Sequence, residues 1–192
     1  AANDIRRLVE FEEDDPFRIL GLHPLEPKRG MVLRAFLPRA AEAWVVLPNG
    51  KNGHKPMRRI HPGGLFQAVF GQAVEFFPYK IGFRDEAGFF QEAEDPYAFY
   101  PNRLSDYDLH LLGQGTHYKS YEKFGAQPIT MRGVSGVLFT VWSPNARSVS
   151  VTGNFNHWTA GAHPMTRVPF SGIWALFVPG LKDGEFYKFA IR

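Results

Sequence analysis

Residues 154–158, Asn-Phe-Asn-His-Trp, place two amides, an imidazole and two aromatic rings directly after a strand-like run. In that run Val149 and Val151 alternate with polar residues, and Gly153 ends it. A sugar presents an apolar C–H face and a rim of hydroxyl groups. A protein can contact the face with a flat aromatic ring and the rim with amide or ammonium groups. The residue types in this stretch therefore favour contact with a carbohydrate.

Four side chains are the candidates for such contact. Trp158 offers the largest ring and an indole N–H, and Asn154 and Asn156 offer amide donors and acceptors. Lys188, in a later Tyr-Lys-Phe run, could donate to a hydroxyl from its ammonium group. The alternatives are structural: the two amides could only close a turn, and the indole could fill a core. Phe155 is predicted to be a core residue because it flanks inward-facing valines.

The surrounding pattern predicts a β-sheet protein. Trp44, Trp142 and Trp174 lie within strand-like runs and are predicted to be core residues. Proline and glycine separate the runs, as in turns between short antiparallel strands. Several short strands of this kind favour a sandwich over a parallel sheet. The predicted strands are 31–37, 43–47, 65–70, 79–84, 136–142, 148–152, 173–178 and 186–191.

An internal repeat with an offset of about 106 residues organises the chain. Its matches keep the same order in both halves, and the small drift of the offset is what loop insertions cause. The sequence therefore predicts two copies of one fold. Matched residues include Gly21 with Gly125, Leu33 with Phe139, Val45 with Val151, Phe66 with Trp174, and Lys80 with Lys188.

The two copies differ in two places. The first has Leu-Pro-Asn-Gly where the second has the aromatic cluster, so it lacks a counterpart of Trp158. The first also continues well beyond Lys80, whereas the second stops at Arg192, soon after Lys188. We therefore expect the second copy to lack its last strand or strands.

Helices are expected only at two places. Residues 3–12 carry apolar side chains at helical spacing, and 105–112 can begin with Ser105 as N-cap and Asp108 in a capping box. The acidic run 10–16 is interpreted as an exposed helix end, with Asp15 as the cap before a proline. The domain boundary is placed in the second helical segment.

Several kinds of chemistry are not indicated by the sequence. No cysteine is present among the 192 residues, and the seven histidines show no metal-binding spacing, so no metal site is predicted. Retaining glycosidic chemistry needs two carboxyl groups about 5–5.5 Å apart. The second copy offers only three carboxylates, and turns explain all of them: a hairpin turn for Asp183 and Glu185, and a helical turn for Glu122. No catalytic residue is therefore predicted.

Charge and hydropathy bound the partners. The net charge is +3, and the one basic cluster is the run 51–59. No nucleic-acid motif surrounds that run, so a solvated hairpin loop is favoured over phosphate contact. No apolar run approaches the roughly 20 residues that span a bilayer, and the acidic start is not typical of a signal peptide. We expect a cytoplasmic protein that binds neither nucleic acid nor membrane.

With these residues in hand, a resemblance to known families can be stated. The segment VLFTVWSPNARSVSVTGNFNHW, with SGIW and YKF downstream, is similar to family 48 carbohydrate-binding modules. The upstream runs DPFRILGLHP, EDPYAFYP and GTHYKSYEKFGAQP resemble the N-terminal part of bacterial glycogen branching enzymes. The resemblance covers nearly the whole chain, in the family's order.

The resemblance carries several implications. It implies an all-β chain of two tandem immunoglobulin-like antiparallel sandwiches with a few short helices, the second truncated at its C-terminus. The expected domains are 1–103, a linker at 104–117, and a family 48-like module at 118–192. In that family the tryptophan of this motif and the lysine of YKF contact α-glucan, and these correspond to Trp158 and Lys188.

The resemblance also implies the partners and the reaction of the parent enzyme. These enzymes cut an α-1,4 bond in glucan and re-form it as an α-1,6 branch without a cofactor, on a catalytic barrel of about 250 residues. The expected partners are α-1,4-glucan or glycogen and the catalytic domain of the same parent chain. The chain alone is expected to be inactive. The alternative is a scaffold that packs on the catalytic domain or a protein partner and binds no sugar.

Overall fold

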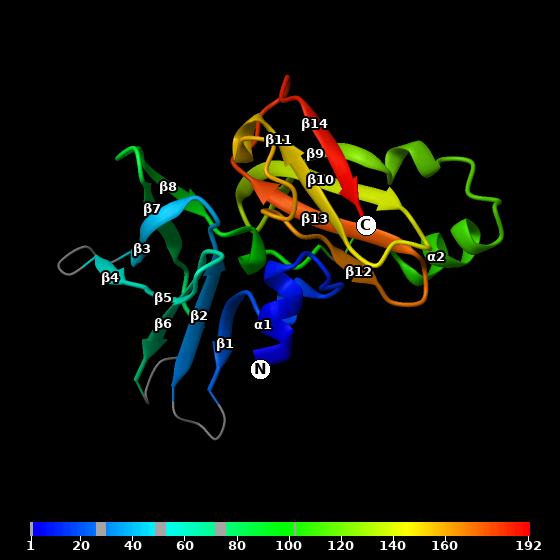
Figure 1. Cartoon of the computed structure of the whole chain (residues 1–192). Helices are drawn as coiled ribbons and strands as arrows, with labels where there is room; N and C mark the ends of the chain where they lie inside the picture. The colour runs from blue at the N-terminus through cyan, green and yellow to red at the C-terminus, as the bar shows by residue number, and fades with distance from the viewer. Residues whose placement is uncertain (1, 26–29, 49–52, 72–75, 102) are drawn as a thin grey trace. The chain divides into compact units, whose positions relative to one another are not determined.

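A computed structural model describes residues 2–25, 30–48, 53–71, 76–101 and 103–192. The chain forms two compact units, one of Ala1–Val9 with Phe17–Ala98 and the other of Glu10–Pro16 with Phe99–Arg192. Both units are built mostly from antiparallel strands (Figure 1). Among the described residues no helix has the length and apolar character needed to cross a membrane.

The first unit contains two four-stranded antiparallel sheets. Their strand orders are β1-β2-β6-β5 and β4-β3-β7-β8 (Figure 1). The strands are β1 (Gly21–Pro24), β2 (Met31–Phe36), β3 (Ala40–Val46), β4 (His54–Pro56), β5 (Arg58–His61), β6 (Leu65–Phe70), β7 (Lys80–Asp85) and β8 (Phe90–Glu94).

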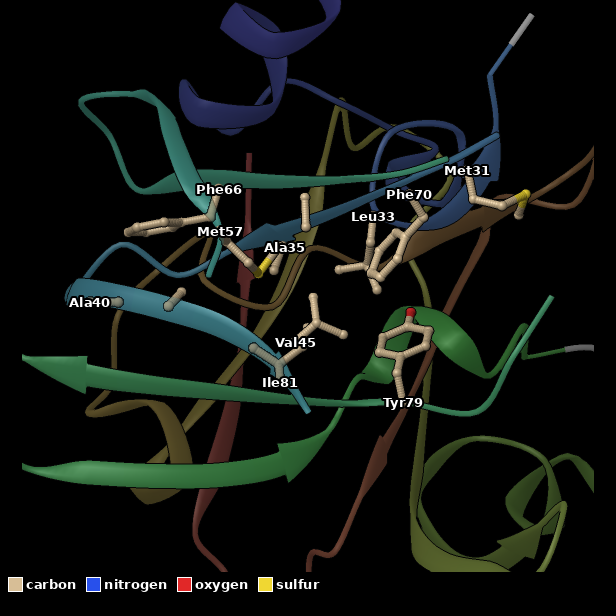
Figure 2. Close-up of a cluster of buried hydrophobic side chains, with 12 residues drawn as sticks. Met31, Leu33, Ala35, Ala40, Val45, Met57, Phe66, Phe70, Tyr79 and Ile81 are labelled. Carbon is tan, nitrogen blue, oxygen red and sulfur yellow. The ribbon is translucent and has the colours of Figure 1, made fainter. Parts of the chain in front are cut away.

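The core of the first unit lies between these two sheets. Figure 2 shows Leu33 and Phe70 from one sheet pointing toward Val45 and Ile81 of the other. Alternate residues of each strand supply this layer, because successive side chains of a strand point to opposite faces. The remaining faces of the sheets therefore look away from this core.

A buried carboxyl group fixes the end of the first unit. Asp95 accepts hydrogen bonds from the Tyr79 hydroxyl at 2.7 Å and from the Tyr97 N–H at 3.0 Å. Burial raises the pKa of Asp95 to about 6, against the lowering effect of these two donors. The EDPYAFYP run thus serves the fold, since it anchors the 3₁₀ turn η2 (Pro96–Ala98) to the residue that precedes β7.

The second unit contains a four-stranded sheet and a two-stranded sheet. The larger has the order β12-β13-β10-β9, and β11 pairs with β14 in the smaller. The ring of Phe139 on β10 packs against Phe155, Tyr187 and Phe189, which joins the two sheets. The strands are β9 (Gly125–Met131), β10 (Val134–Trp142), β11 (Val149–Gly153), β12 (Thr166–Val168), β13 (Ile173–Pro179) and β14 (Tyr187–Ile191).

The strand orders follow the internal repeat. The order β1-β2-β6-β5 of the first unit corresponds to β9-β10-β13-β12 of the second, and the pair β3-β7 corresponds to β11-β14. All eight strands predicted from the sequence are present, with ends shifted by three residues at most. Shorter strands such as β4, β5 and β12 were not predicted, because they carry too few residues to show a period.

Both predicted helices are present: α1 (Ala2–Val9) overlaps the predicted 3–12, and the second lies near the middle of the chain. Helix α2 (Asp106–Gly113) has Ser105 as its N-cap, and Asp108 completes the capping box as expected. Helix α1 ends at Val9 and Glu13 is only 3% exposed, so 10–16 is not an exposed helix end, although the 3₁₀ turn η1 (Pro16–Arg18) does begin at Pro16 directly after Asp15. The segment 10–16 belongs to the second unit, where the backbone oxygen of Asp14 accepts from the N–H of Arg167 at 2.8 Å.

Two of the three tryptophans predicted to be core residues are not fully buried. Trp174 is inaccessible, as expected, but Trp142 at the end of β10 is 64% exposed, and Trp44 lies partly exposed on the outer face of its sheet. Both side chains follow a strand period but point away from the core. The prediction for Phe155 is confirmed, since its ring packs against Phe139 and His163.

The basic run 51–59 is not a loop over its described part. Residues 51 and 52 lie outside the described residues, and the rest forms β4, β5 and the residue between them. The Lys55 ammonium lies 4.5 Å from the ring centre of Phe70, and the Arg59 guanidinium lies 5.1 Å from that of Phe66. These cations therefore pack on aromatic rings of the sheet.

Candidate functional site

The candidate site begins where β11 ends. The short 3₁₀ turn η4 (Asn154–Asn156) follows the strand, and His157 and Trp158 then adopt positive φ angles of 53° and 59°. Such angles are uncommon for residues with a side chain and cost about 1–3 kcal/mol each. The turn is held by backbone bonds, including one from the Trp158 N–H to the Gly153 oxygen at 2.9 Å.

The indole of Trp158 has a fixed orientation on this turn. The side chain is 44% exposed, and its Nε1–H donates to Asn154 Oδ1 at 3.1 Å. Two positions predicted to contact sugar are thus brought together. Asn154 aims the ring and leaves its apolar face as the part of Trp158 that a ligand can contact.

Asn156 lies inside the turn, as in the structural alternative in which its amide only closes the turn. It is only 7% exposed, and its Oδ1 accepts from the Gly153 N–H at 2.9 Å. Its Nδ2 donates to the Val151 oxygen and to His163 Nδ1, each at 3.0 Å. With its amide committed to these three bonds, Asn156 supports the turn from inside.

Gly153 is required by close approach of its neighbours. A Cβ at this position would collide with the backbone oxygen of Phe186 and would lie 2.5 Å from Cε1 of Phe155. Gly153 is also paired with Tyr187 across β11 and β14. The strand can therefore bend into the turn only without a side chain at Gly153.

The second lysine of the repeat lies beside the same turn. Lys188 on β14 is exposed and pairs with Thr152, one position before Gly153. Its counterpart in the first unit, Lys80, forms an ion pair with Glu94 of β8 at 3.3 Å. Within the described residues Lys188 has no acidic partner. The ammonium at the second position is thus available for a ligand in a way that the first is not.

His163 makes the hydrogen bonding of this turn sensitive to pH. Burial lowers the pKa of His163 from its usual 6.5 to about 4. The neutral ring is therefore the folded form, and its Nδ1 accepts the Asn156 amide bond. Protonation would place a hydrogen on an atom that now accepts one.

We expect the second unit to lose stability in mild acid through His163. A group with a lowered folded pKa stabilises the fold above its unfolded value near 6.5, and this contribution is lost as the pH falls through about 4. At about 1.4 kcal/mol for each pKa unit, the loss is about 3 kcal/mol. Chemical denaturation followed on second-unit amides between pH 7 and 3.5 measures it. His163→Gln should flatten this dependence, and exposed His110→Gln should not; equal slopes in both variants would contradict the assignment.

The described part of the chain shows no cluster of acidic or histidine side chains suited to a metal ion. Of the carboxylates considered for catalysis, Glu122 pairs with Lys119 at 3.9 Å, and Asp183 accepts from the Gly184 N–H. Neither interaction brings a second carboxylate alongside.

Comparison with known proteins adds the family context. Residues 1–97 match the family model "alpha-1,4-glucan branching enzyme GlgB, N-terminal domain", and residues 123–192 match "Carbohydrate-binding module 48 (Isoamylase N-terminal domain)". The chain is 42% identical over 189 residues to the 1,4-alpha-glucan branching enzyme GlgB of Nitrosococcus oceani, and 44% identical over 189 residues to that of Picrophilus torridus. Each alignment covers 98% of this chain but only 24% and 25% of the relative.

The chain therefore spans about a quarter of the length of these curated relatives. Among solved structures, apo pullulanase from Paenibacillus barengoltzii aligns with 49% of this chain and 14% of its own, at 23% identity and a TM-score of 0.36. Ligand-free PulA from Klebsiella pneumoniae aligns with 91% of this chain and 18% of its own, at 17% identity and a TM-score of 0.29.

Proposed function

The chain belongs to the family of alpha-1,4-glucan branching enzyme GlgB N-terminal domains, and on this premise we propose that it holds α-1,4-glucan for a transfer reaction carried out elsewhere in the parent enzyme. The observation that carries the proposal is the exposed indole of Trp158, oriented by Asn154 at the end of β11. The glucan contacts are assigned to Trp158, Asn154 and Lys188. Asn156 is assigned to the support of the turn.

The chemistry of the site fits a neutral polyhydroxyl ligand. The ring can cover a C–H face of glucose, and the Lys188 ammonium can donate to a hydroxyl oxygen. The turn holds two strained residues in place without a ligand, so the ring is positioned before binding and little ordering cost is added. One ring with few polar partners supports weak binding, with a dissociation constant of about 1 mM, or about −4 kcal/mol.

Electrophoresis of the chain in gels that contain glycogen tests the proposal. Retardation is expected in glycogen and not in dextran, a neutral glucan with other linkages. Lys188→Met should reduce the retardation, and Lys182→Met, a change at an exposed lysine of the same unit outside the turn, should not. Equal mobility with and without glycogen would favour the alternative, a scaffold that packs on the catalytic domain of the same chain and binds no sugar.

We propose that each unit is an immunoglobulin-like sandwich. The strand orders β1-β2-β6-β5 and β4-β3-β7-β8 support this for the first unit. In the second unit, β9-β10-β13-β12 repeats the order β1-β2-β6-β5, and the pair β11-β14 repeats the central pair β3-β7. The proposed domains remain an N-terminal module over 1–103, a linker over 104–117 and a carbohydrate-binding module over 118–192.

A further strand is proposed beside β14. In the first unit β7 pairs with both β3 and β8, whereas β14 pairs only with β11 among the described residues. An open strand edge leaves backbone N–H and C=O groups without partners. Extending the chain by the next about 20 residues of the natural gene, enough for a loop and a strand, should raise the melting temperature of the second unit by about 5 °C or more. An unchanged melting temperature would argue against the added strand.

The branching reaction itself is assigned to the part of the parent enzyme that lies outside the region matched by this chain. The interactions of Glu122 and Asp183, two of the carboxylates considered for catalysis, bring no second carboxylate beside them, as retaining glycosidic chemistry would need. We expect the pure chain to leave amylose unbranched in an iodine-staining assay. Reproducible branching by the chain alone, at a rate that follows its concentration, would overturn this assignment.

A further inference from the structure

The outer face of the sheet β4-β3-β7-β8 in the first unit carries an aromatic pair. The strand register sets Trp44 of β3 opposite Gly82 of β7, and Gly82 opposite Glu92 of β8. Phe90 lies two residues from Glu92 along β8, opposite Arg84. Neighbouring residues of β3 and β7 point into the core on the other side, so these side chains share the outer face.

The Trp44 indole packs directly against Gly82. A Cβ at this position would collide with Nε1 of Trp44 and would lie 2.5 Å from its Cε2, so the ring lies against the glycine backbone. Phe90 is nearly parallel to the indole, with 13° between the planes and 5.3 Å between the ring centres. Phe90 is 49% exposed and presents a flat apolar surface to solvent.

The indole position is not the one that sheet stability alone would select. Within the described residues the buried Nε1–H of Trp44 has no hydrogen-bond partner. Leaving a buried donor unpaired costs about 1–3 kcal/mol. The Trp44 indole leaves its N–H unpaired and yet stays stacked on the Phe90 ring. This combination points to a function for the flat aromatic surface.

The rim of this face is polar and nearly balanced in charge. Its acids and bases are paired with one another between strands of the sheet, and the His54–Glu92 pair joins the two edge strands β4 and β8 across β3 and β7. A ligand that approaches the rings therefore meets hydrogen-bonding groups but little net charge. The pairs are His54 with Glu92 at 3.3 Å, Lys80 with Glu94 at 3.3 Å, and Arg84 with Glu42 at 3.7 Å.

We propose that this face, formed by Trp44, Gly82 and Phe90 with His54 and Glu92 at its rim, is a second α-glucan-binding site, on the first unit. A glucose C–H face can lie on the Phe90 ring, and the Glu92 carboxylate and the His54 imidazole can bond its hydroxyls. The inference goes beyond the proposed function, which places glucan contact on the second unit only.

The duplication accounts for the different position of this site. The first unit has no counterpart of Trp158 on its third strand, and the second has no counterpart of β8 among its described strands. Because Phe90 and Glu92 both lie on β8, the face cannot form on the second unit as described. Each copy of the fold thus carries its aromatic surface on an element that the other does not share.

Titration of the ¹⁵N-labelled chain with maltoheptaose at millimolar concentration tests the inference. We expect amide shifts at Gly82, Phe90 and Glu92 that saturate, in addition to those at the Trp158 turn. Phe90→Ala should weaken the first-unit response by roughly five-fold or more, since it removes the exposed ring. Phe76→Ala, a change at a still more exposed ring of the same unit, should leave it unchanged.

The two sites are read from different resonances, so their failures are distinguishable. Absence of first-unit shifts, or shifts that Phe90→Ala does not weaken, overturns the second site and leaves the Trp158 site standing. First-unit shifts that persist in Trp158→Ala support it, whether or not the second unit responds. Misfolding of Phe90→Ala can be told from a loss of binding, because misfolding would collapse the dispersion of all first-unit amide resonances. If the variant misfolds, Glu92→Gln is used instead, since it keeps the ring and should weaken the same response.

Discussion

Replacing Trp158 with alanine is expected to weaken maltoheptaose binding to the second unit by about ten-fold and to leave the fold intact. The indole is 44% exposed, so a bound sugar would cover roughly 60 Å² of it, worth about 1.5 kcal/mol at 25 cal/mol per Å². The lost side chain has no role in the core of the unit. Its one side-chain bond is to Asn154, which is also exposed.

Trp142→Ala is the matched control for this experiment. Trp142 belongs to the same unit and is 64% exposed, but it lies at the end of β10 and outside the turn. We expect it to bind maltoheptaose as the parent does. Isothermal calorimetry at high sugar concentration compares the two variants, with circular dichroism as a check of the fold. Undiminished binding by Trp158→Ala would remove the indole from the site, and unfolding would make it a structural residue.

Gly153→Val is expected to have the largest effect on stability, a loss of about 3 kcal/mol or more in the second unit. The new side chain would overlap the backbone oxygen of Phe186 and the ring of Phe155. The Phe186 oxygen cannot move freely, because the next residue, Tyr187, is paired with Gly153. The Phe155 ring cannot move freely either, because it packs on Phe139. The displaced turn would also carry Trp158 out of position, so glycogen retardation should fall with stability.

Gly113→Val tests whether any added side chain would do the same. A Cβ at Gly113, the last residue of α2, meets nothing within 4 Å. We expect this variant to unfold within about 0.5 kcal/mol of the parent, as surface changes usually do. Urea denaturation of the two variants, followed by tryptophan fluorescence, makes the comparison. If Gly153→Val were as stable as Gly113→Val, the close approach at the end of β11 would not constrain the turn.

The turn that carries the candidate site could be predicted from the sequence because its signals are local. The end of β11, the glycine and the exposed Trp158 all follow from one strand period and the residues after it. The role of Asn156 could not be read in this way. Its inward orientation depends on His163, which lies beyond the turn and supplies the acceptor for its amide.

The surface aromatics show a second limit of sequence patterns. Trp142 and Trp44 lie in strands, and a strand period separates two faces without telling which one is buried. Trp44 is predicted to be a core residue because it lies within a strand-like run. Its pairing with Gly82 was the missed signal, since a glycine inside a strand often marks a close approach.

The assignment of 10–16 failed for a third reason. Its bonds join residues far apart in the sequence: the Ser148 hydroxyl donates to the Phe11 oxygen at 2.7 Å, and the Thr166 hydroxyl donates to Asp15 at 3.2 Å. No local pattern in an acidic run encodes such partners. The run reads as a helix end because the helix before it is real and stops at Val9.

The most direct test of glucan binding at the end of β11 is the indole N–H resonance of Trp158 during titration of the unmodified chain with maltoheptaose. The predicted result is a saturable shift of this resonance, together with the amides of Asn154 and Lys188, and a dissociation constant of about 1 mM. The three positions should report one common constant, because one sugar chain contacts them. A Trp158 resonance that stays in place while glycogen still retards the chain would contradict the account and move the binding surface elsewhere.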